Sequence, residues 1–202
     1  MKFYRDTVTE QSWRLLQNLV RQYQLVVIGG WAVWLYTGQL KSKDIDVVVD
    51  VTELGKLRQE FEVFKNERLR KYEFRQGEIE VDIYVPFYSL PGIGAKKVWE
   101  DARVVEGFKA PSAELLWVLK ATTWMSRRGS GKGRKDLLDL ISLLESGEID
   151  KEKLRQWVVE AGAKLAAAEV MQELQQITSV EELGFNQHQT ARSKQQWLKI
   201  LT

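Results

Sequence analysis

The segment from Leu25 to Asp50 constrains the fold more than any other part of this sequence. It opens with a short, entirely apolar run, Leu25 to Ile28, which ends at the glycine pair Gly29-Gly30. A second short run, Ile45 to Val49, is strongly β-branched. Runs of this length and composition are typical of buried strands, and such strands need a helical layer on at least one face. The segment therefore predicts a sheet that is covered by helices.

Further elements follow from the periodicity of the apolar residues. Helical spacing predicts helices over 7–23, 31–36 and 53–66, and Thr7 and Glu10 have the spacing of a capping box at the start of the first. Polar and apolar residues alternate around Gly77, which predicts a hairpin of residues 72–74 and 78–85, and 104–105 is expected to be an edge strand.

The pattern changes near Pro111, where helical periodicity takes over. We expect an apolar-faced helix from about 112 to 125, and then amphipathic helices near 134–145, 151–161, 163–177 and 188–201, one of them capped by Asp150. The predicted fold class is α+β: a mixed, mainly antiparallel sheet of four to five strands flanked by helices, with a C-terminal helical bundle. The predicted domains are residues 1–108 and 109–202, packed on each other.

Composition excludes several kinds of chemistry. The chain has no cysteine, so disulfides, thiolate metal sites and a cysteine nucleophile are excluded. Its one histidine, His188, excludes a multi-histidine zinc site. The formal charge of +2 gives no general case for a nucleic-acid or membrane binder, and without a long apolar run or a leader we expect a cytoplasmic protein. Any reaction must use carboxylates, lysines, hydroxyls or backbone groups.

The aspartates beside the second strand are the strongest functional signal. Asp44 and Asp46 are two residues apart, so their side chains leave the same face of the strand, about 7 Å apart at Cα. Two carboxylates aimed together repel each other unless a divalent cation lies between them, and Mg²⁺ prefers such hard oxygen ligands. Asp82 in the predicted hairpin is a third candidate ligand if its strand neighbours the second strand. Three such carboxylates suit phosphoryl-group transfer with two cations.

Gly29-Gly30 fits the same reaction, because it joins a strand to a helix and lets backbone N–H groups approach the phosphates of a nucleotide. The glycine pair is followed at a separation of fourteen residues by Asp44-Ile45-Asp46, and later by Asp82. Together these motifs resemble the nucleotidyltransferase superfamily, which has a polymerase-β-like fold. Ser42 and Lys43, just before the aspartates, resemble the type IV toxin (abortive-infection) branch of that superfamily.

The resemblance continues to about residue 144 and implies roles for individual residues. Asp44, Asp46 and Asp82 would bind Mg²⁺ (or Mn²⁺), with Asp82 as general base or second-metal ligand. Lys120 would meet the triphosphate if its helix turns it toward the sheet, although a lysine on a helix is also commonly solvated. The later Asp136 and Asp139 lie on one helix face, where one of them would orient Lys120 or Arg134. For Asp136, a favourable interaction with the dipole at the N-terminus of its helix is the alternative. The nucleotide-binding set is then Gly29, Gly30, Ser42, Lys43, Asp136 and Asp139.

For the acceptor, the toxin-like resemblance implies the 3′ end of tRNA and a cognate antitoxin protein as partner. One basic cluster would help to hold RNA, and it consists of Arg127, Arg128, Lys132, Arg134 and Lys135. The expected activity is Mg²⁺-dependent transfer of a nucleoside monophosphate from an NTP to a hydroxyl. Two alternatives stay open: an antibiotic-type adenylyltransferase, which shares the Gly-Gly-Trp opening, and a non-catalytic module that binds nucleotides or proteins.

Overall fold

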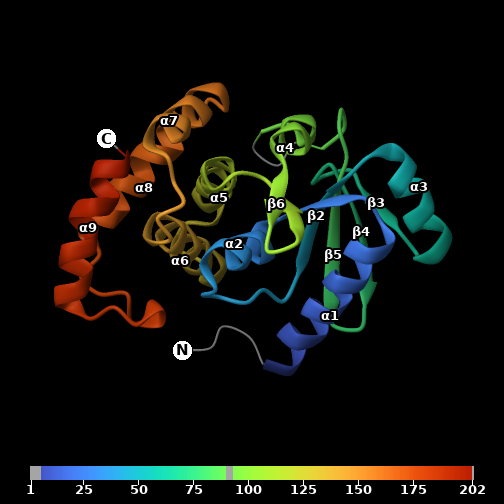
Figure 1. The fold of residues 1–202 in the computed structure, drawn as a ribbon, viewed down its shortest axis with the longest axis horizontal. Coiled ribbons are helices and arrows are strands. Elements are labelled where there is room, and N and C mark those ends of the chain that lie inside the picture. Colours follow the sequence, from blue (N-terminus) through green and yellow to red (C-terminus); the bar gives the residue numbers. More distant parts are fainter. Residues whose placement is uncertain (1–5, 90–92, 202) are drawn as a thin grey trace. The chain divides into compact units, whose positions relative to one another are not determined.

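The computed structural model describes residues 6–89 and 93–201 of the chain. Their Cα positions divide into two compact units, with the division between Ser112 and Ala113 (Figure 1). The first unit contains a sheet and the second is helical, as the change of pattern near Pro111 predicts. The domain boundary at 108/109 stays a prediction, because a compact unit is not by itself an independently folding domain.

The first unit is built on a five-stranded sheet. Its strands, in spatial order, are β1 (Leu25–Ile28), β2 (Ile45–Val49), β5 (Ile79–Tyr84), β4 (Lys71–Gln76) and β3 (Phe64–Asn66). β2 and β5 run parallel, and the other three neighbouring pairs are antiparallel. The predicted mixed, mainly antiparallel sheet is therefore confirmed. β1 and β2 have the bounds that the sequence predicts for them.

Four helices and a small second sheet complete this unit. They are α1 (Asp6–Gln22), α2 (Gly29–Thr37), α3 (Val51–Glu60), α4 (Ala95–Asp101), β6 (Arg103–Val105) and β7 (Phe108–Ala110). α1 packs against β5 (Figure 1), and its Leu16 and Leu19 are buried. The predicted capping box is wrong, because α1 already includes Asp6 and so Thr7 lies inside the helix.

Two predictions about the strands need correction. The helix predicted over 53–66 ends at Glu60, and residues 64–66 pair with β4 as strand β3 instead. Asp50 begins α3 by accepting a hydrogen bond from the backbone N–H of Glu53. Val104-Val105 is a strand, but it pairs with β7 in the two-stranded sheet and is not an edge of the main sheet.

Alternation along β2, β5 and β4 separates the main sheet into an apolar and a polar face. Ile45, Val47, Val81 and Ile83 are each at most 1% exposed and belong to one face. The intervening residues of these strands belong to the other, where the register aligns the acidic side chains of β2, β5 and β4. The sequence pattern thus gathers the carboxylates on one side of the sheet.

The second unit is a bundle of helices, as predicted. Its elements are α5 (Ala113–Arg127), α6 (Gly131–Glu145), α7 (Lys151–Glu160), α8 (Lys164–Gln176), the short 3₁₀ helix η1 (Glu181–Leu183) and α9 (Gln187–Leu201). Asp150 caps α7, as expected, by accepting from the backbone N–H of Lys153.

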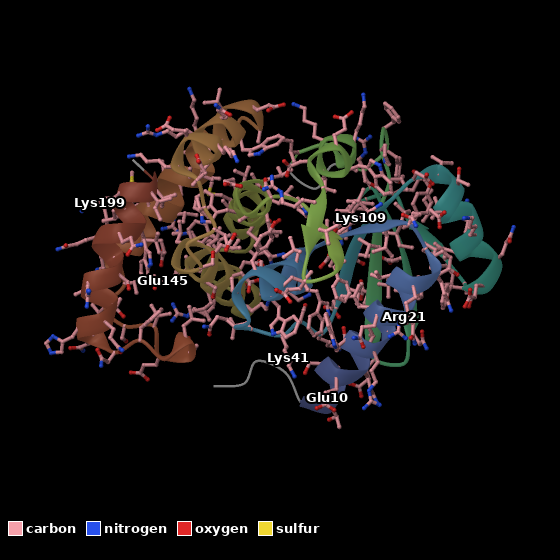
Figure 2. The ribbon with its side chains drawn as sticks, in the orientation of Figure 1. Glu10, Arg21, Lys41, Lys109, Glu145 and Lys199 are labelled. Carbon is pink, nitrogen blue, oxygen red and sulfur yellow. The ribbon has the colours of Figure 1, made fainter. Side chains whose placement is uncertain are left out.

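Tryptophans supply much of the bundle's core. Trp117, Trp124 and Trp197 are each at most 2% exposed, and burying rings of this size contributes strongly to stability. The indole N–H of Trp197 in α9 donates a hydrogen bond to Glu145 at the end of α6, one of the residues labelled in Figure 2. None of the helices within the described residues has the length and apolar character needed to cross a membrane.

Candidate active site

The predicted aspartates meet on the polar face of the sheet. Asp46 lies in β2 and Asp82 in the parallel neighbour β5, where the register makes them direct partners. Both are half-buried, and so is Asp44, which immediately precedes β2. The strand pairing on which the third-ligand prediction depended is therefore present.

The electrostatics of Asp82 reflect its burial and the negative charge of Asp46 on the neighbouring strand. Burial, followed by the negative charge of Asp46, raises the pKa of Asp82 to about 7, although the ammonium of Lys71 opposes the rise. A divalent cation would stabilise the ionised form of Asp82 beside Asp46, and the donors are hard oxygens. The side chains thus fit Mg²⁺ or Mn²⁺, the cations that the sequence predicts.

Gly29 makes the close approach to Asp46 possible. It is the first residue of α2 and has φ +66°, which is in the left-handed region. A Cβ placed on Gly29 would lie 2.2 Å from Oδ2 of Asp46, 2.7 Å from its Cγ and 2.9 Å from its Cβ. The glycine is therefore required by a carboxylate of the site and by its own backbone conformation.

The N-terminus of α2 lies beside Asp46. Its N-cap residue, Ile28, makes no side-chain capping hydrogen bond and pairs with Asp46 across β1 and β2. A helix N-terminus carries partial positive charge and favours a nearby anion, whether a carboxylate or a phosphate. Gly30, in the first turn, is buried. The roles of Gly29 and Gly30 toward phosphate stay predictions.

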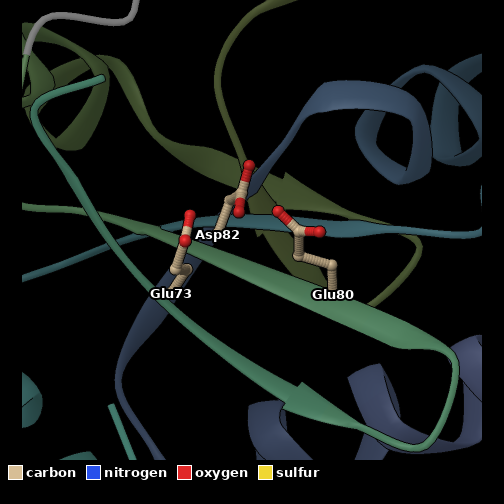
Figure 3. Close-up of side chains that lie close together, drawn as sticks. All are labelled: Glu73, Glu80 and Asp82. Carbon is tan, nitrogen blue, oxygen red and sulfur yellow. The ribbon is translucent and has the colours of Figure 1, made fainter. Parts of the chain in front are cut away.

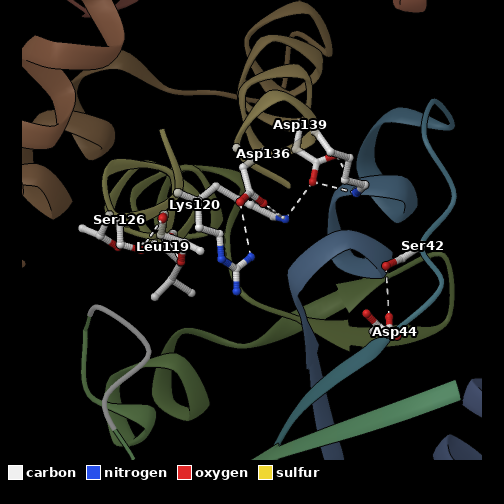
Figure 4. Close-up of polar contacts among 12 residues, drawn as sticks. Ser42, Asp44, Leu119, Lys120, Ser126, Asp136 and Asp139 are labelled. Atoms are coloured by element: carbon white, nitrogen blue, oxygen red, sulfur yellow. Dashed lines mark hydrogen bonds and ion pairs between the residues drawn. The ribbon is translucent and has the colours of Figure 1, made fainter. Parts of the chain in front are cut away.

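Ser42 and Lys43 precede the aspartates as the sequence indicates. The hydroxyl of Ser42 donates a hydrogen bond to the backbone carbonyl of Asp44 at 3.0 Å, and Ser42 is 7% exposed (Figure 4). The contact fixes the turn that leads into β2 and so helps to position Asp44. Lys43 is half-buried. No contact to a nucleotide is tested for either residue.

The sequence analysis missed three residues of this face: Lys71, Glu73 and Glu80. Glu73 in β4 is the direct partner of Asp82, and Glu80 precedes Asp82 by two residues in β5 (Figure 3). Glu73, Glu80 and Asp82 each offer a carboxylate oxygen, and these oxygens all lie within 4.8 Å of one another. Asp44 and Asp46 do not belong to this set among the described residues. The register of the predicted hairpin could have identified Glu73.

In the helical unit, Lys120 lies among carboxylates. Its Nζ is 3.1 Å from Oδ1 of Asp136 and 2.7 Å from Oδ2 of Asp139, both carried by α6 (Figure 4). The lysine is 8% exposed, so it is not the solvated lysine of the alternative interpretation. Lys135 also pairs with Asp139, and burial lowers the pKa of Lys135. Asp136 and Asp139 thus pair with Lys120 and lie where they can orient it, whereas the role of Lys120 toward a triphosphate stays a prediction.

The basic cluster predicted to hold RNA is largely paired with acidic groups. Its ion pairs are Arg127 with Asp136, Arg128 with Glu169 and Glu173, Arg134 with Glu182, and Lys135 with Asp139. Arg134 is thus held by Glu182 rather than by Asp136. Lys135 is buried, whereas Lys132 is exposed and makes no ion pair within the described part of the chain. A contact of these residues with RNA stays a prediction.

Comparison with known proteins gives matches in structure only. No protein-family model matches the chain, and no curated protein matches its sequence. The antibiotic-resistance factor ANT(2″)-Ia, in complex with adenylyl-2″-tobramycin, has a TM-score of 0.56 and 16% identity, covering 80% of this chain and 99% of its own. A nucleotidyltransferase assigned in H. pylori has a TM-score of 0.53 and 13% identity, covering 98% and 94%. JHP933 from Helicobacter pylori has a TM-score of 0.51 and 12% identity, covering 98% and 91%. This chain has the nucleotidyltransferase fold.

Proposed function

We propose that this protein is a nucleotidyltransferase, which moves a nucleoside monophosphate from an NTP to a hydroxyl acceptor and uses Mg²⁺ or Mn²⁺. The observation that supports it best is the pairing of Asp46 with Asp82 across β2 and β5, beside the N-terminus of α2. Carboxylates and an N-terminus suit this reaction, because an in-line displacement needs positioning and charge neutralisation more than covalent chemistry.

In the proposed reaction, the acceptor oxygen forms a bond to the α-phosphorus of the NTP while the bond to pyrophosphate breaks. Asp44, Asp46 and Asp82 would hold the cation, which neutralises phosphate charge when bound. Asp82 takes the proton that the acceptor hydroxyl loses. In the metal-free protein the pKa of Asp82 is raised to about 7, so this carboxylate holds a proton more tightly than an exposed aspartate does. Lys120 is proposed to bind the triphosphate.

Replacing the paired aspartates tests this activity. Asp46→Asn and Asp82→Asn should each lower the rate of label transfer from an NTP by several orders of magnitude, with the circular dichroism spectrum unchanged. Glu78→Gln is the matched control, because Glu78 is an exposed residue in the turn of the same hairpin. Normal transfer by the Asp46→Asn protein would contradict the proposal. Nucleotide binding without any transfer would favour the non-catalytic alternative.

For the acceptor we propose RNA, with the 3′ end of tRNA as the site of addition and an antitoxin protein as partner. This part depends on the resemblance carried by Ser42, Lys43 and the aspartates. The basic cluster adds little support, because cations already paired with carboxylates contribute less to phosphate binding. Incubation with Mg²⁺, each labelled NTP and total cellular RNA tests it, and label found only in protein would contradict it.

Adenylyl transfer to a small antibiotic is the second candidate. The observation in its favour is the structural similarity to ANT(2″)-Ia, whose complex contains an adenylylated tobramycin. Aminoglycosides are cations, so this candidate predicts an acidic acceptor pocket. The same labelled assay distinguishes the two, with tobramycin replacing RNA: label in the antibiotic and none in RNA would establish the second candidate.

A further inference from the structure

The ammonium group of Lys71 lies among Glu73, Glu80 and Asp82, which form an acidic cluster on the polar face of the sheet. The Nζ of Lys71 is 2.5 Å from Oδ1 of Asp82, 3.0 Å from Oε2 of Glu73 and 3.4 Å from Oε1 of Glu80. Figure 3 shows the three carboxylates converging from β4 and β5. The distances to Asp82 and Glu73 are those of charge-assisted hydrogen bonds. The ammonium therefore occupies the position between the carboxylates that a metal ion would take.

Lys71 is also well enclosed. It is 5% exposed, which is unusual for a lysine. Its ammonium has carboxylate partners on both β4 and β5, and it lies against Asp82, one of the three predicted metal ligands.

We propose that the ammonium of Lys71 replaces the second divalent cation, so that this site takes one metal ion rather than two. The proposal rests on the proposed function, in which Asp44, Asp46 and Asp82 hold the first cation. Lys71 is then a positioning residue that acts through Asp82, because it fixes one oxygen of that carboxylate.

Sterics and charge both support this assignment. Two-metal sites place their cations about 3.5–4 Å apart, with carboxylate oxygens shared between them. One oxygen of Asp82 already has an ammonium at 2.5 Å, which leaves no room for a metal ion beside that oxygen on the same side. Glu73 and Glu80, the two other acids that would complete a second metal site, have the same ammonium as partner. A divalent cation would have to displace a buried lysine.

The test is the number of Mn²⁺ ions bound per chain, measured from the electron paramagnetic resonance signal of free Mn²⁺ with the metal alone. Wild type is compared with Lys71→Met, which keeps most of the length of the side chain and removes its charge, and with Lys71→Arg, which keeps the charge. Arg75→Met is the matched control, because Arg75 is on the same strand and pairs with Glu80 but is 77% exposed.

We expect one Mn²⁺ per wild-type chain and one additional Mn²⁺ in Lys71→Met, with no gain in Lys71→Arg or Arg75→Met. The gain should disappear in Lys71→Met/Glu73→Gln/Glu80→Gln, which assigns the new ion to the acidic cluster. An unchanged number in a folded Lys71→Met protein would overturn the proposal, and so would two ions in the wild type.

This design separates the proposal from the proposed function. If wild type binds no Mn²⁺, the metal-dependent activity is contradicted, whereas the difference between Lys71→Met and wild type still decides the role of Lys71. If Lys71→Met does not fold, the wild-type number decides: one ion supports the proposal and two overturn it. A purely structural role for Lys71 would change stability without adding a bound ion.

Discussion

Gly29→Ala is the substitution whose effect can be worked out most completely from the structure. An alanine at φ +66° has a left-handed backbone, which costs about 1–2 kcal/mol. Its Cβ would also lie 2.2 Å from Oδ2 of Asp46, and because the Cβ of Asp46 is only 2.9 Å away, a change of rotamer cannot relieve the whole clash. Overpacking of this kind adds about 1–3 kcal/mol, so we expect a total loss of about 2–5 kcal/mol in the free energy of unfolding.

A double-mutant cycle separates the two parts of this loss. Asp46→Ala removes the two closest atoms, so Gly29→Ala should destabilise the Asp46→Ala protein about 1–2 kcal/mol less than it destabilises wild type. Gly38→Ala at the end of α2 is the control for backbone strain, since Gly38 has φ +65° and nothing within 4 Å of an added Cβ. Urea unfolding measures all four variants. If the effects of Gly29→Ala and Asp46→Ala simply add, the inferred contact between these residues is refuted.

The remaining predictions concern charge. The pKa of Asp82 rises from 3.8 to about 7 on folding, so the native state binds its proton more tightly, and the stabilisation present below pH 4 is lost as the pH rises through 7. At 1.36 kcal/mol per pKa unit the loss approaches about 4 kcal/mol, and urea unfolding of metal-free protein between pH 4 and pH 8.5 should show it in wild type but not in Asp82→Asn. Lys120→Met should lower the free energy of unfolding by about 3 kcal/mol, because it leaves the buried Asp136 and Asp139 without this partner. Arg128→Met should change it by under about 1 kcal/mol, because the ion pairs of Arg128 are exposed. Equal effects of these two substitutions on the urea midpoint would contradict that reasoning.

The parts of the fold that could be predicted are those whose signal is local. The strands at 25–28 and 45–49 are apolar runs with sharp ends, so their bounds follow from a few neighbouring residues. β3 could not be predicted in this way: it has three residues, Phe64 is exposed, and pairing with β4 is what makes it a strand. Such pairing is a tertiary contact that a single sequence does not reveal.

The candidate site shows the same difference. Asp44 and Asp46 are recognisable from their two-residue spacing beside a strand, and the alternating pattern of the hairpin is enough to propose Asp82. Lys71 was missed because its role depends on which residues lie opposite it, and only the register between β4 and β5 defines them. The ion pairs of Arg128 and Arg134 in the basic cluster could not be predicted for a related reason, since their partners Glu169, Glu173 and Glu182 are far away in sequence.

The turn between β4 and β5 has a consequence for how this site can be altered. Residues 77 and 78 join the strands directly, and Gly77 has φ +60°, which suits a two-residue hairpin turn. A slip of one residue in this hairpin would turn Lys71 and Glu73 to the apolar face. An insertion or deletion at this exposed turn would therefore change the charge of the polar face as directly as a substitution within it, so the length of the turn helps to determine which side chains the candidate site contains.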